Sequence, residues 1–306
     1  MNDTFSVIQV EHLRKAYRDT VAVDDLSFTV QRGEIFGIVG PNGAGKTTTM
    51  ECLAGLRRAD RGRLSVLGLD PLQQGRELRR RVGVQLQQAA LPDDLKVWEA
   101  LDLFATFYHH PLDWHTLLVT WGLEEKRTAR FASLSGGQKQ RLFIALSLVN
   151  DPELVFLDEI TTGLDPQARH NTWELVEKLR EQGKTVVLVT HYMDEAERLC
   201  DRVAIIDHGS LVALDTPRQL IAGLRAEKRI IFSAAGREDY GWLRGAPGVS
   251  GVARQNGSVV VTGSGPLLAR VVSLLAERDI VPADLRTEQA TLEDVFLTLT
   301  GHALRD

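Results

Sequence analysis

The chain has 306 residues, of which 43% are hydrophobic and 25% are charged, and its formal net charge at pH 7 is -5. This length is too great for one small domain and fits one large α/β domain with a modest second domain. The slightly acidic balance gives no electrostatic reason for nucleic acid to be the main partner, so no nucleic acid is expected.

Cysteine usage and the length of the apolar runs both indicate a cytosolic chain. Cys52 and Cys200 lie far apart in sequence without metal-ligand spacing, which favours buried thiols in a reducing compartment over a disulfide. Residues 1–10 lack a basic start followed by an apolar stretch, and the longest apolar runs, such as 142–149, are far shorter than a membrane span. We expect a chain that does not cross a membrane by itself.

The first domain is predicted over residues 1–222. Short β-branched runs alternate there with amphipathic stretches, which is typical of a mostly parallel sheet covered by helices. Residues 35–39, 154–157 and 185–189 are predicted to be buried strands. Between the first two, from about 92 to 140, helical periodicity predicts a helical insert, and its aromatic stripe, which includes Phe104, Phe107 and Tyr108, is interpreted as core ahead of a docking surface.

A second, smaller α+β domain is predicted over residues 223–306, where the pattern changes. A strand at 229–233, a short helix at 238–244 and a hairpin at 249–262 are followed by a helix at 267–277, a strand near 280–285 and a closing helix opened by a capping box of Thr291 and Asp294. The hairpin is predicted to turn at Asn256-Gly257. This order matches a ferredoxin-like unit, which is our hypothesis for the domain.

A phosphate-loop pattern occupies the segment from Gly40 to Thr47, directly after the predicted strand 35–39 and before a predicted helix. Its glycines let successive N–H groups curl toward phosphates, Lys46 reaches the outer phosphates, and Thr47 offers its hydroxyl to Mg²⁺. A mere glycine-rich turn would not explain Lys46 and Thr47 together. The expected ATP-binding set is Gly40, Pro41, Asn42, Gly43, Ala44, Gly45, Lys46, Thr47 and the adjoining Thr48.

An apolar run ending in two carboxylates, Asp158 and Glu159, is the second chemical feature. Neighbouring strand residues point in opposite directions, so one carboxylate can support Mg²⁺ while the other faces the reacting phosphate. Asp158 is the predicted metal-side residue and Glu159 the predicted water-orienting base. Two acids after a strand are usually only a solvated strand end, and the phosphate loop upstream is what reverses that interpretation.

A third feature places small residues at the start of a predicted helix, which makes a second anion-binding device. Its residues are Leu134, Ser135, Gly136, Gly137 and Gln138. Here the chain resembles the ATP-binding cassette (ABC) family, whose signature motif has this sequence and lies between the phosphate loop and the acidic strand. The resemblance covers essentially the whole chain and implies a P-loop NTPase fold, an ABC ATPase core with a helical subdomain.

The resemblance assigns further roles by position. Gln87 is similar to the glutamine that joins the core to the helical insert and touches the metal, and His191 is similar to the switch histidine that contacts the γ-phosphate. Asp165 lies in a segment that resembles the loop crossing the dimer interface. Tyr17 resembles the aromatic residue that stacks on adenine, although by itself it would be interpreted as an ordinary half-buried strand residue.

Two local features bear on this assignment. The family usually has proline after the acidic pair, where this chain has Ile160. Because Ile160 replaces no reacting group, we expect the chain to hydrolyse ATP, at a rate that this residue can alter. His109, His110 and His115 have no carboxylate or cysteine that completes a ligand set, so they are interpreted as solvated loop histidines rather than a metal site.

The resemblance also implies partners. The signature of one subunit closes over the phosphate loop of another, so one phosphate loop and one signature per chain predict a head-to-tail homodimer that binds two MgATP, each between Lys46 of one copy and Ser135 of the other. Separate membrane-spanning permease subunits are expected to dock near Gln87 and the insert. The small second domain is expected to steady the dimer or modulate turnover.

Three segments sharpen the resemblance to ATP subunits of bacterial multidrug, antibiotic or sodium exporters: 134–142, 190–197 and 291–296. Export at the cytoplasmic face of the membrane is therefore expected. The alternative is a soluble ABC-type switch acting on ribosomes or DNA. Against it, only about 90 residues, by numbering from 46 to 135, separate the two nucleotide motifs, whereas DNA-repair relatives place a very long coiled coil there; ribosome-acting relatives usually carry two cassettes.

Overall fold

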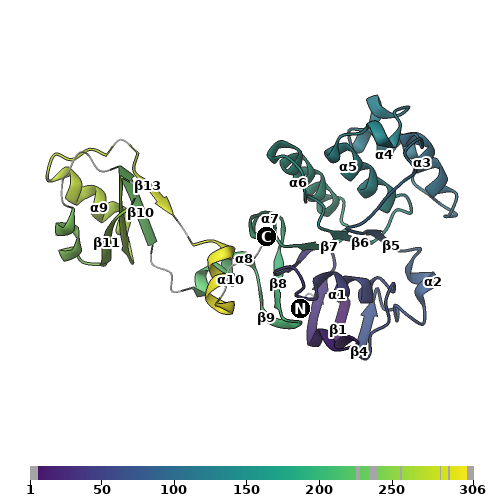
Figure 1. Cartoon of the computed structure of the whole chain (residues 1–306), viewed down its shortest axis with the longest axis horizontal. Coiled ribbons are helices and arrows are strands. Elements are labelled where there is room, and N and C mark those ends of the chain that lie inside the picture. The colour runs from purple at the N-terminus through teal and green to yellow at the C-terminus, as the bar shows by residue number, and fades with distance from the viewer. Residues whose placement is uncertain are drawn as a thin grey trace. The chain divides into compact units, whose positions relative to one another are not determined.

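The computed structural model describes residues 6–224, 228–233, 240–255, 257–282, 284–288 and 290–301. The chain divides into two compact units (Figure 1). The first comprises Met1–Arg218 together with Phe296–Asp306, and the second comprises Gln219–Val295. Each unit contains its own sheet structure and its own hydrophobic core.

A six-stranded sheet lies at the centre of the first unit, in the order β5-β6-β7-β3-β8-β9. All its neighbouring pairs are parallel except the last, β8 with β9. The three strands expected from buried apolar runs are present as β3, β6 and β7, and every residue in them is buried. The bounds are β3 Ile35–Val39, β5 Val82–Gln85, β6 Leu154–Asp158, β7 Thr185–Thr190, β8 Arg202–Asp207 and β9 Ser210–Asp215.

A separate antiparallel sheet, in the order β2-β1-β4, packs on the first. It contains β1 Ser6–Tyr17, β2 Thr20–Gln31 and β4 Arg61–Val66. The sequence pattern did not distinguish this layer from the mostly parallel sheet. In β2 buried and exposed residues alternate toward the end of the strand, because one face packs on the core and the other meets solvent. One cluster of buried side chains, including Ile8, Phe36 and Phe156, joins the two sheets.

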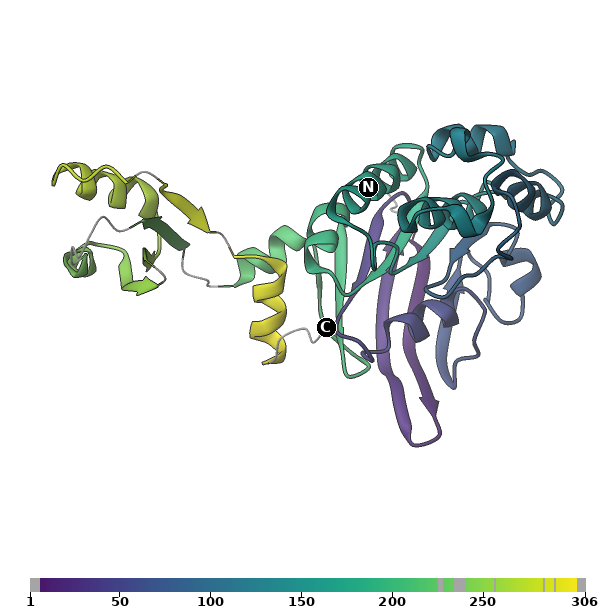
Figure 2. The same cartoon turned by 45° about the horizontal axis from the view of Figure 1, so that its top comes forward.

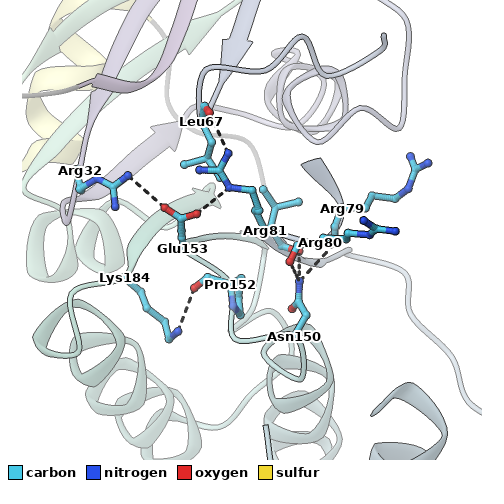
Figure 3. A network of polar contacts seen from close by, with 10 residues as sticks. Arg32, Leu67, Arg79, Arg80, Arg81, Asn150, Pro152, Glu153 and Lys184 are labelled. Carbon is cyan, nitrogen blue, oxygen red and sulfur yellow. Dashed lines mark hydrogen bonds and ion pairs between the residues drawn. The ribbon is translucent and has the colours of Figure 1, made fainter. Parts of the chain in front are cut away.

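A network of polar contacts fixes the amino-terminal ends of four parallel strands (Figure 3). Glu153, directly before β6, accepts hydrogen bonds from Arg32 at 3.2 Å and from Arg81, directly before β5, at 2.8 Å. Lys184, before β7, donates to the carbonyl of the residue preceding Glu153 at 3.0 Å. Asn150 donates to the first carbonyl of β5 at 2.9 Å. The network aligns the strands, so that their carboxyl ends meet at the opposite edge of the sheet.

Helices cover the large sheet and form the insert between β5 and β6. In Figures 1 and 2 the insert helices α3, α4 and α5 gather at one end of this unit, away from β1 and β4. Within the aromatic stripe, Phe104 and Tyr108 are half-buried, while Phe107 is 68% exposed, so the core interpretation fails for Phe107. The bounds are α1 Lys46–Leu53, α2 Gly75–Leu78, α3 Val97–Ala105, α4 Trp114–Thr120, η1 Glu124–Lys126, η2 Phe131–Ser133, α5 Gly136–Ser147, α6 Pro166–Glu181 and α7 Met193–Leu199.

The second unit contains a four-stranded antiparallel sheet in the order β11-β12-β10-β13, with its own buried cluster. The predicted strand near 280–285 is instead β13 at Arg286–Glu288. Asn256 and residues 234–239 lie outside the described residues, so the predicted turn and the start of the predicted helix at 238–244 do too. The elements are β10 Lys228–Ser233, η3 Gly241–Gly245, β11 Val249–Gln255, β12 Ser258–Gly263 and α9 Leu267–Ala276.

Two helices contain the boundaries between the units, α8 Pro217–Gly223 and α10 Leu292–Thr300. The second begins with the expected capping box: the Thr291 N–H donates to Asp294 Oδ2 at 2.8 Å, and the Asp294 N–H donates to Thr291 Oγ1 at 3.4 Å. The sequence therefore located the start of this helix from its cap alone.

Candidate nucleotide-binding site

The phosphate-loop segment leaves the buried strand β3 and enters α1, which begins at Lys46. Two of its glycines are required by the close approach of other backbone. A Cβ at Gly40 would lie 2.0 Å from the carbonyl oxygen of Ile206, and one at Gly45 would lie 2.1 Å from that of Ala22. Both glycines also have positive φ. The loop can therefore curl tightly only with glycine at these positions.

Lys46 is buried within the loop, and its side chain is only 5% exposed. Its Nζ donates to the carbonyls of Gly40 at 2.8 Å and Pro41 at 2.9 Å. Burial lowers the pKa of Lys46, and the carboxylates of Glu159 and Asp158 oppose that shift. The structure thus holds a cation at the centre of the loop, beside both predicted acidic residues.

Asp158, at the end of β6, is fully buried. Its Oδ2 accepts a hydrogen bond from Thr47 Oγ1 at 3.0 Å, while its Oδ1 has no hydrogen-bond partner. Burial, and next the charge of Glu159, raise the pKa of Asp158 to about 6, against the Thr47 hydrogen bond and the charge of Lys46. An orphaned carboxylate oxygen beside a hydroxyl supplies the oxygen donors that Mg²⁺ prefers, so these residues fit that cation.

Gln85 supports Asp158 and was not anticipated from the sequence. Its side chain is 4% exposed, and its Oε1 accepts the Asp158 N–H at 3.3 Å. The signal available was a polar residue ending an apolar strand two positions before Gln87. That signal is weak, because polar residues at strand ends are common.

Glu159, directly after β6, forms hydrogen bonds with residues at or just after the carboxyl ends of β5 and β7. Its Oε2 accepts from Gln87 Nε2 at 2.5 Å, its Oε1 lies 3.0 Å from His191 Nδ1, and its own N–H donates to the Val189 carbonyl at 2.8 Å. Its φ of 48° is left-handed, a conformation that costs a non-glycine residue roughly 1–3 kcal/mol and clusters at functional sites. The carboxylate is thus fixed by Gln87 on one side and His191 on the other.

The signature segment forms a different structure. Ser135 is the N-cap of α5: its Oγ accepts the Gln138 N–H at 3.3 Å, and Gln138 Oε1 accepts the Ser135 N–H at 3.0 Å. A Cβ at Gly137 would lie 3.1 Å from Ala168 Cβ on α6, so glycine permits close helix packing. Across the described ranges, no hydrogen bond joins 134–138 to the phosphate loop of the same chain.

Asp165 and Tyr17, assigned by resemblance, lie outside that cluster of hydrogen bonds. Asp165 is the N-cap of α6, and its Oδ1 accepts the Ala168 N–H at 2.9 Å. Tyr17 ends β1 and is 36% exposed; Arg57 Cζ lies 5.2 Å and Lys15 Nζ 5.4 Å from its ring centroid. Its ring is therefore accessible for stacking and flanked by two cations.

The remaining sequence features are ordinary structural elements. Ile160 is fully buried, so it fills part of the core directly after the acidic pair. His109, His110 and His115 are exposed, and no group of three or more potential metal-ligating side chains occurs in the part of the chain that the structure describes. Cys52 and Cys200 are buried free thiols.

The raised pKa of Asp158 generates a pH-dependent stability prediction. A carboxyl whose folded-state pKa lies above its unfolded value destabilises the fold when ionised, and this cost declines as pH falls below about 6 toward the ordinary value of 3.8. In EDTA without nucleotide, Asp158→Asn should raise Tm at pH 8 by about 2–4 °C. The gain should shrink below pH 6. Thermal unfolding measured between pH 8 and pH values below 6 tests this prediction. The control is Asp113→Asn, at an exposed N-cap, which should show no gain in Tm. Equal Tm values for Asp158→Asn and the parent chain at pH 8 would contradict the prediction.

Comparisons with known proteins agree with this geometry. The family model described as ABC transporter matches residues 23–162. The Nod factor export ATP-binding protein I of Ralstonia nicotianae is 39% identical over 98% of this chain and 95% of its own length. The protein of that name from Burkholderia lata is 40% identical over 98% of both chains.

Solved structures are similar over about 70% of the chain. One described as the ATP binding subunit of an ABC transporter has a TM-score of 0.64 and 30% identity, covering 72% of this chain and 95% of its own. A dimeric ATP-binding cassette in a post-hydrolysis state bound to ADP and phosphate has a TM-score of 0.61 and 26% identity, covering 68% and 98%. With the site geometry, these similarities show that the chain belongs to the ABC transporter family, as an ATP-binding and ATP-hydrolysing subunit of the exporter kind.

Proposed function

We propose that two copies of this chain enclose two MgATP head to tail and drive export through a separate membrane permease. One observation carries the proposal: one chain gathers Lys46, Asp158 and Glu159 around the phosphate loop, whereas its signature Ser135 caps α5 without a hydrogen bond to that loop. A second copy would supply the missing signature. The dimeric cassette similar to this chain supports such an assembly.

Within each site, Thr47 and Asp158 would hold Mg²⁺ together with the nucleotide phosphates, and Gln87 would contact that metal. Mg²⁺ would neutralise phosphate charge and orient the reacting phosphate. The orphaned Oδ1 of Asp158 and the adjacent Thr47 hydroxyl support this role. Lys46 supplies a positive charge to the outer phosphates, and Tyr17 stacks on the adenine.

Glu159 orients the attacking water and accepts its proton, and His191 positions the carboxylate and contacts the γ-phosphate. The contacts of Glu159 with Gln87 and His191, and its left-handed backbone directly after β6, support this role. Ile160 leaves both reacting groups in place. Across the interface, Gly136 and Gly137 of the partner copy, at the start of its α5, present N–H groups to the γ-phosphate, and Asp165 lies in the crossing loop.

The names of the relatives support a direction and a cargo class for transport. Both curated relatives are named for Nod factor export, and each is 39–40% identical along nearly the whole chain. That extent of similarity supports an export role over the ribosome or DNA alternative. Cargo contacts would belong to the permease, so Nod factor is the cargo class to test first.

A groove beside Gln87 is the proposed docking surface for the permease. It has a volume of about 450 Å³, and its lining includes Leu56, Phe104 and Tyr108 together with Arg79. No helix among the described residues is long and apolar enough to span a bilayer. A peripheral subunit at the cytoplasmic face, attached through this groove, fits both observations.

The second unit is proposed to be ferredoxin-like and to steady the dimer or modulate turnover. The sheet order β11-β12-β10-β13, with α9 between β12 and β13, supports that topology. Its separate core supports an accessory role.

Glu159→Gln tests the role of the base. The amide cannot accept a proton, whereas the binding groups remain, so turnover should fall by about 10²-fold or more while ATP-dependent dimerisation persists. Lys46→Ala should instead weaken ATP binding before dimers form. Steady-state ATPase rates and light scattering measure both; normal turnover by Glu159→Gln would refute the assignment.

Ala90→Trp tests the docking groove. Ala90 is exposed and lines the groove, so a bulky ring should block a permease segment without disturbing the core. ATPase activity of the isolated chain should be unchanged, while co-purification with the permease is lost. Val119→Trp, at a 59% exposed position of the insert outside the groove, is the control. The docking proposal would be wrong if Ala90→Trp still co-purified with the permease as the parent chain does, or if the parent chain co-purified with ribosomes alone.

Deleting residues 225–295, which keeps the Phe296–Asp306 part of the first unit, tests the accessory role of the second unit. We expect weaker ATP-dependent dimerisation or altered ATPase turnover, because the steadying unit is lost. Analytical ultracentrifugation and ATPase assays measure these properties. If dimerisation and turnover are both unchanged, the second unit has another purpose.

A further inference from the structure

A buried carboxylate outside the nucleotide site connects the segments that carry its working residues. Glu195 on α7 is fully buried. Its Oε1 accepts hydrogen bonds from Thr161 Oγ1 at 2.9 Å and from Trp173 Nε1 at 2.9 Å, and Thr190 also hydrogen-bonds with the carboxylate. Its Oε2 has no hydrogen-bond partner among the described residues. The buried carboxyl group holds the donors that it does gather in one geometry, because losing any of them would leave further polar groups unpaired.

The three donors come from three functional segments. Thr161 lies two residues after Glu159, and Thr190 directly precedes His191. Trp173 lies on α6, the helix that Asp165 caps. Glu195 therefore touches the segment of the proposed base, the segment of the switch histidine and the helix of the interface loop.

Arg169 adds a second set of contacts to the junction formed by Glu195, Thr161, Trp173 and Thr190. Arg169 on α6 forms an ion pair with Asp194 on α7. Its guanidinium lies 4.8 Å from the ring centroid of Trp173 and 4.7 Å from that of Tyr192, the residue after His191. Burial raises the pKa of Glu195, and the three hydrogen bonds and the charge of Arg169 oppose that shift. Two independent sets of contacts thus couple α6 to the His191 segment.

We propose that Glu195 is a positioning residue for ATP hydrolysis, which fixes the Glu159–His191 contact to the interface helix α6. Engagement of the Asp165 loop by a second copy would then be transmitted to the water-orienting carboxylate through Thr161, Trp173 and Glu195. This inference rests on the proposed roles of Glu159 and His191. It assigns no new reacting group.

Paired substitutions at Glu195 separate positioning from simple stabilisation. Glu195→Ala removes the acceptor, so kcat for ATP should fall by about tenfold or more, with KM for ATP changed by less than about twofold, because misplacement of a reacting group costs rate rather than ground-state binding. Glu195→Gln keeps an oxygen for Thr161 and Trp173, so it should recover most of kcat.

Thr172→Val is the matched control. Thr172 is also buried on α6, but its hydroxyl donates to the Ala168 carbonyl rather than to Glu195. Its loss should lower Tm while leaving kcat unchanged. If Glu195→Ala does not yield folded protein, Trp173→Phe, which removes only the indole N–H from the junction and keeps an aromatic ring, should lower kcat by about threefold or more.

Glu159→Gln, assayed alongside, distinguishes failure of the proposed catalytic site from failure of the positioning role of Glu195. Normal turnover by Glu159→Gln would mean that the proposed site is wrong. Loss of turnover in Glu159→Gln, with kcat of Glu195→Ala or Trp173→Phe within about twofold of the parent chain, would overturn the positioning role alone. An equal fall of kcat in Thr172→Val and Glu195→Ala would do the same, because stability loss would then explain both.

Discussion

The site depends on one constraint, the adjacency and parallel direction of β5, β6, β7 and β3. Because their carboxyl ends meet at one edge, the segments after them bring Gln87, Glu159, His191 and the phosphate loop into hydrogen-bonding range. At the other edge, Glu153 binds the starts of the same strands together. A shift of β6 against either neighbour would separate Glu159 from its partners.

The arrangement also explains why the proposed working unit is larger than one chain. The acidic residues and Lys46 form a connected cluster. In contrast, the side chain and the N–H of Ser135 both form hydrogen bonds within the cap of α5. This capped helix start packs closely on α6 at Gly137, and the N–H groups of Gly136 and Gly137 lie in the first turn of α5. These N–H groups suit a phosphate that another copy carries. The junction at Glu195 then lies between that interface and the base, through α6 and Thr161.

Much of the candidate site, and the strands that lead into it, could be predicted from the sequence, because the residues that carry the chemistry lie in short contiguous motifs. The phosphate loop, the acidic pair and the buried strands before them have local spacing that fixes their structure, and Gly40 and Gly45 are required by nearby backbone. Gln85 and Glu195 were missed, since their partners lie far away in sequence and only the folded sheet brings them together. Phe107 was misjudged as core because periodicity cannot say whether a helix face has a partner. The late strand β13 was placed too early because its three residues are all exposed and give no apolar signal.

A negative charge introduced at the signature tests the shared site most directly. In a Glu159→Gln background, Ser135→Asp keeps a good N-cap for α5 but places a negative charge opposite the partner's phosphates, whereas Ser135→Asn keeps the cap without the charge. Light scattering with MgATP should show dimers for Ser135→Asn and monomers for Ser135→Asp, with unchanged ATP affinity of the monomer. ATP-dependent dimers of Ser135→Asp, or loss of ATP binding by its monomer, would contradict a site divided between two chains.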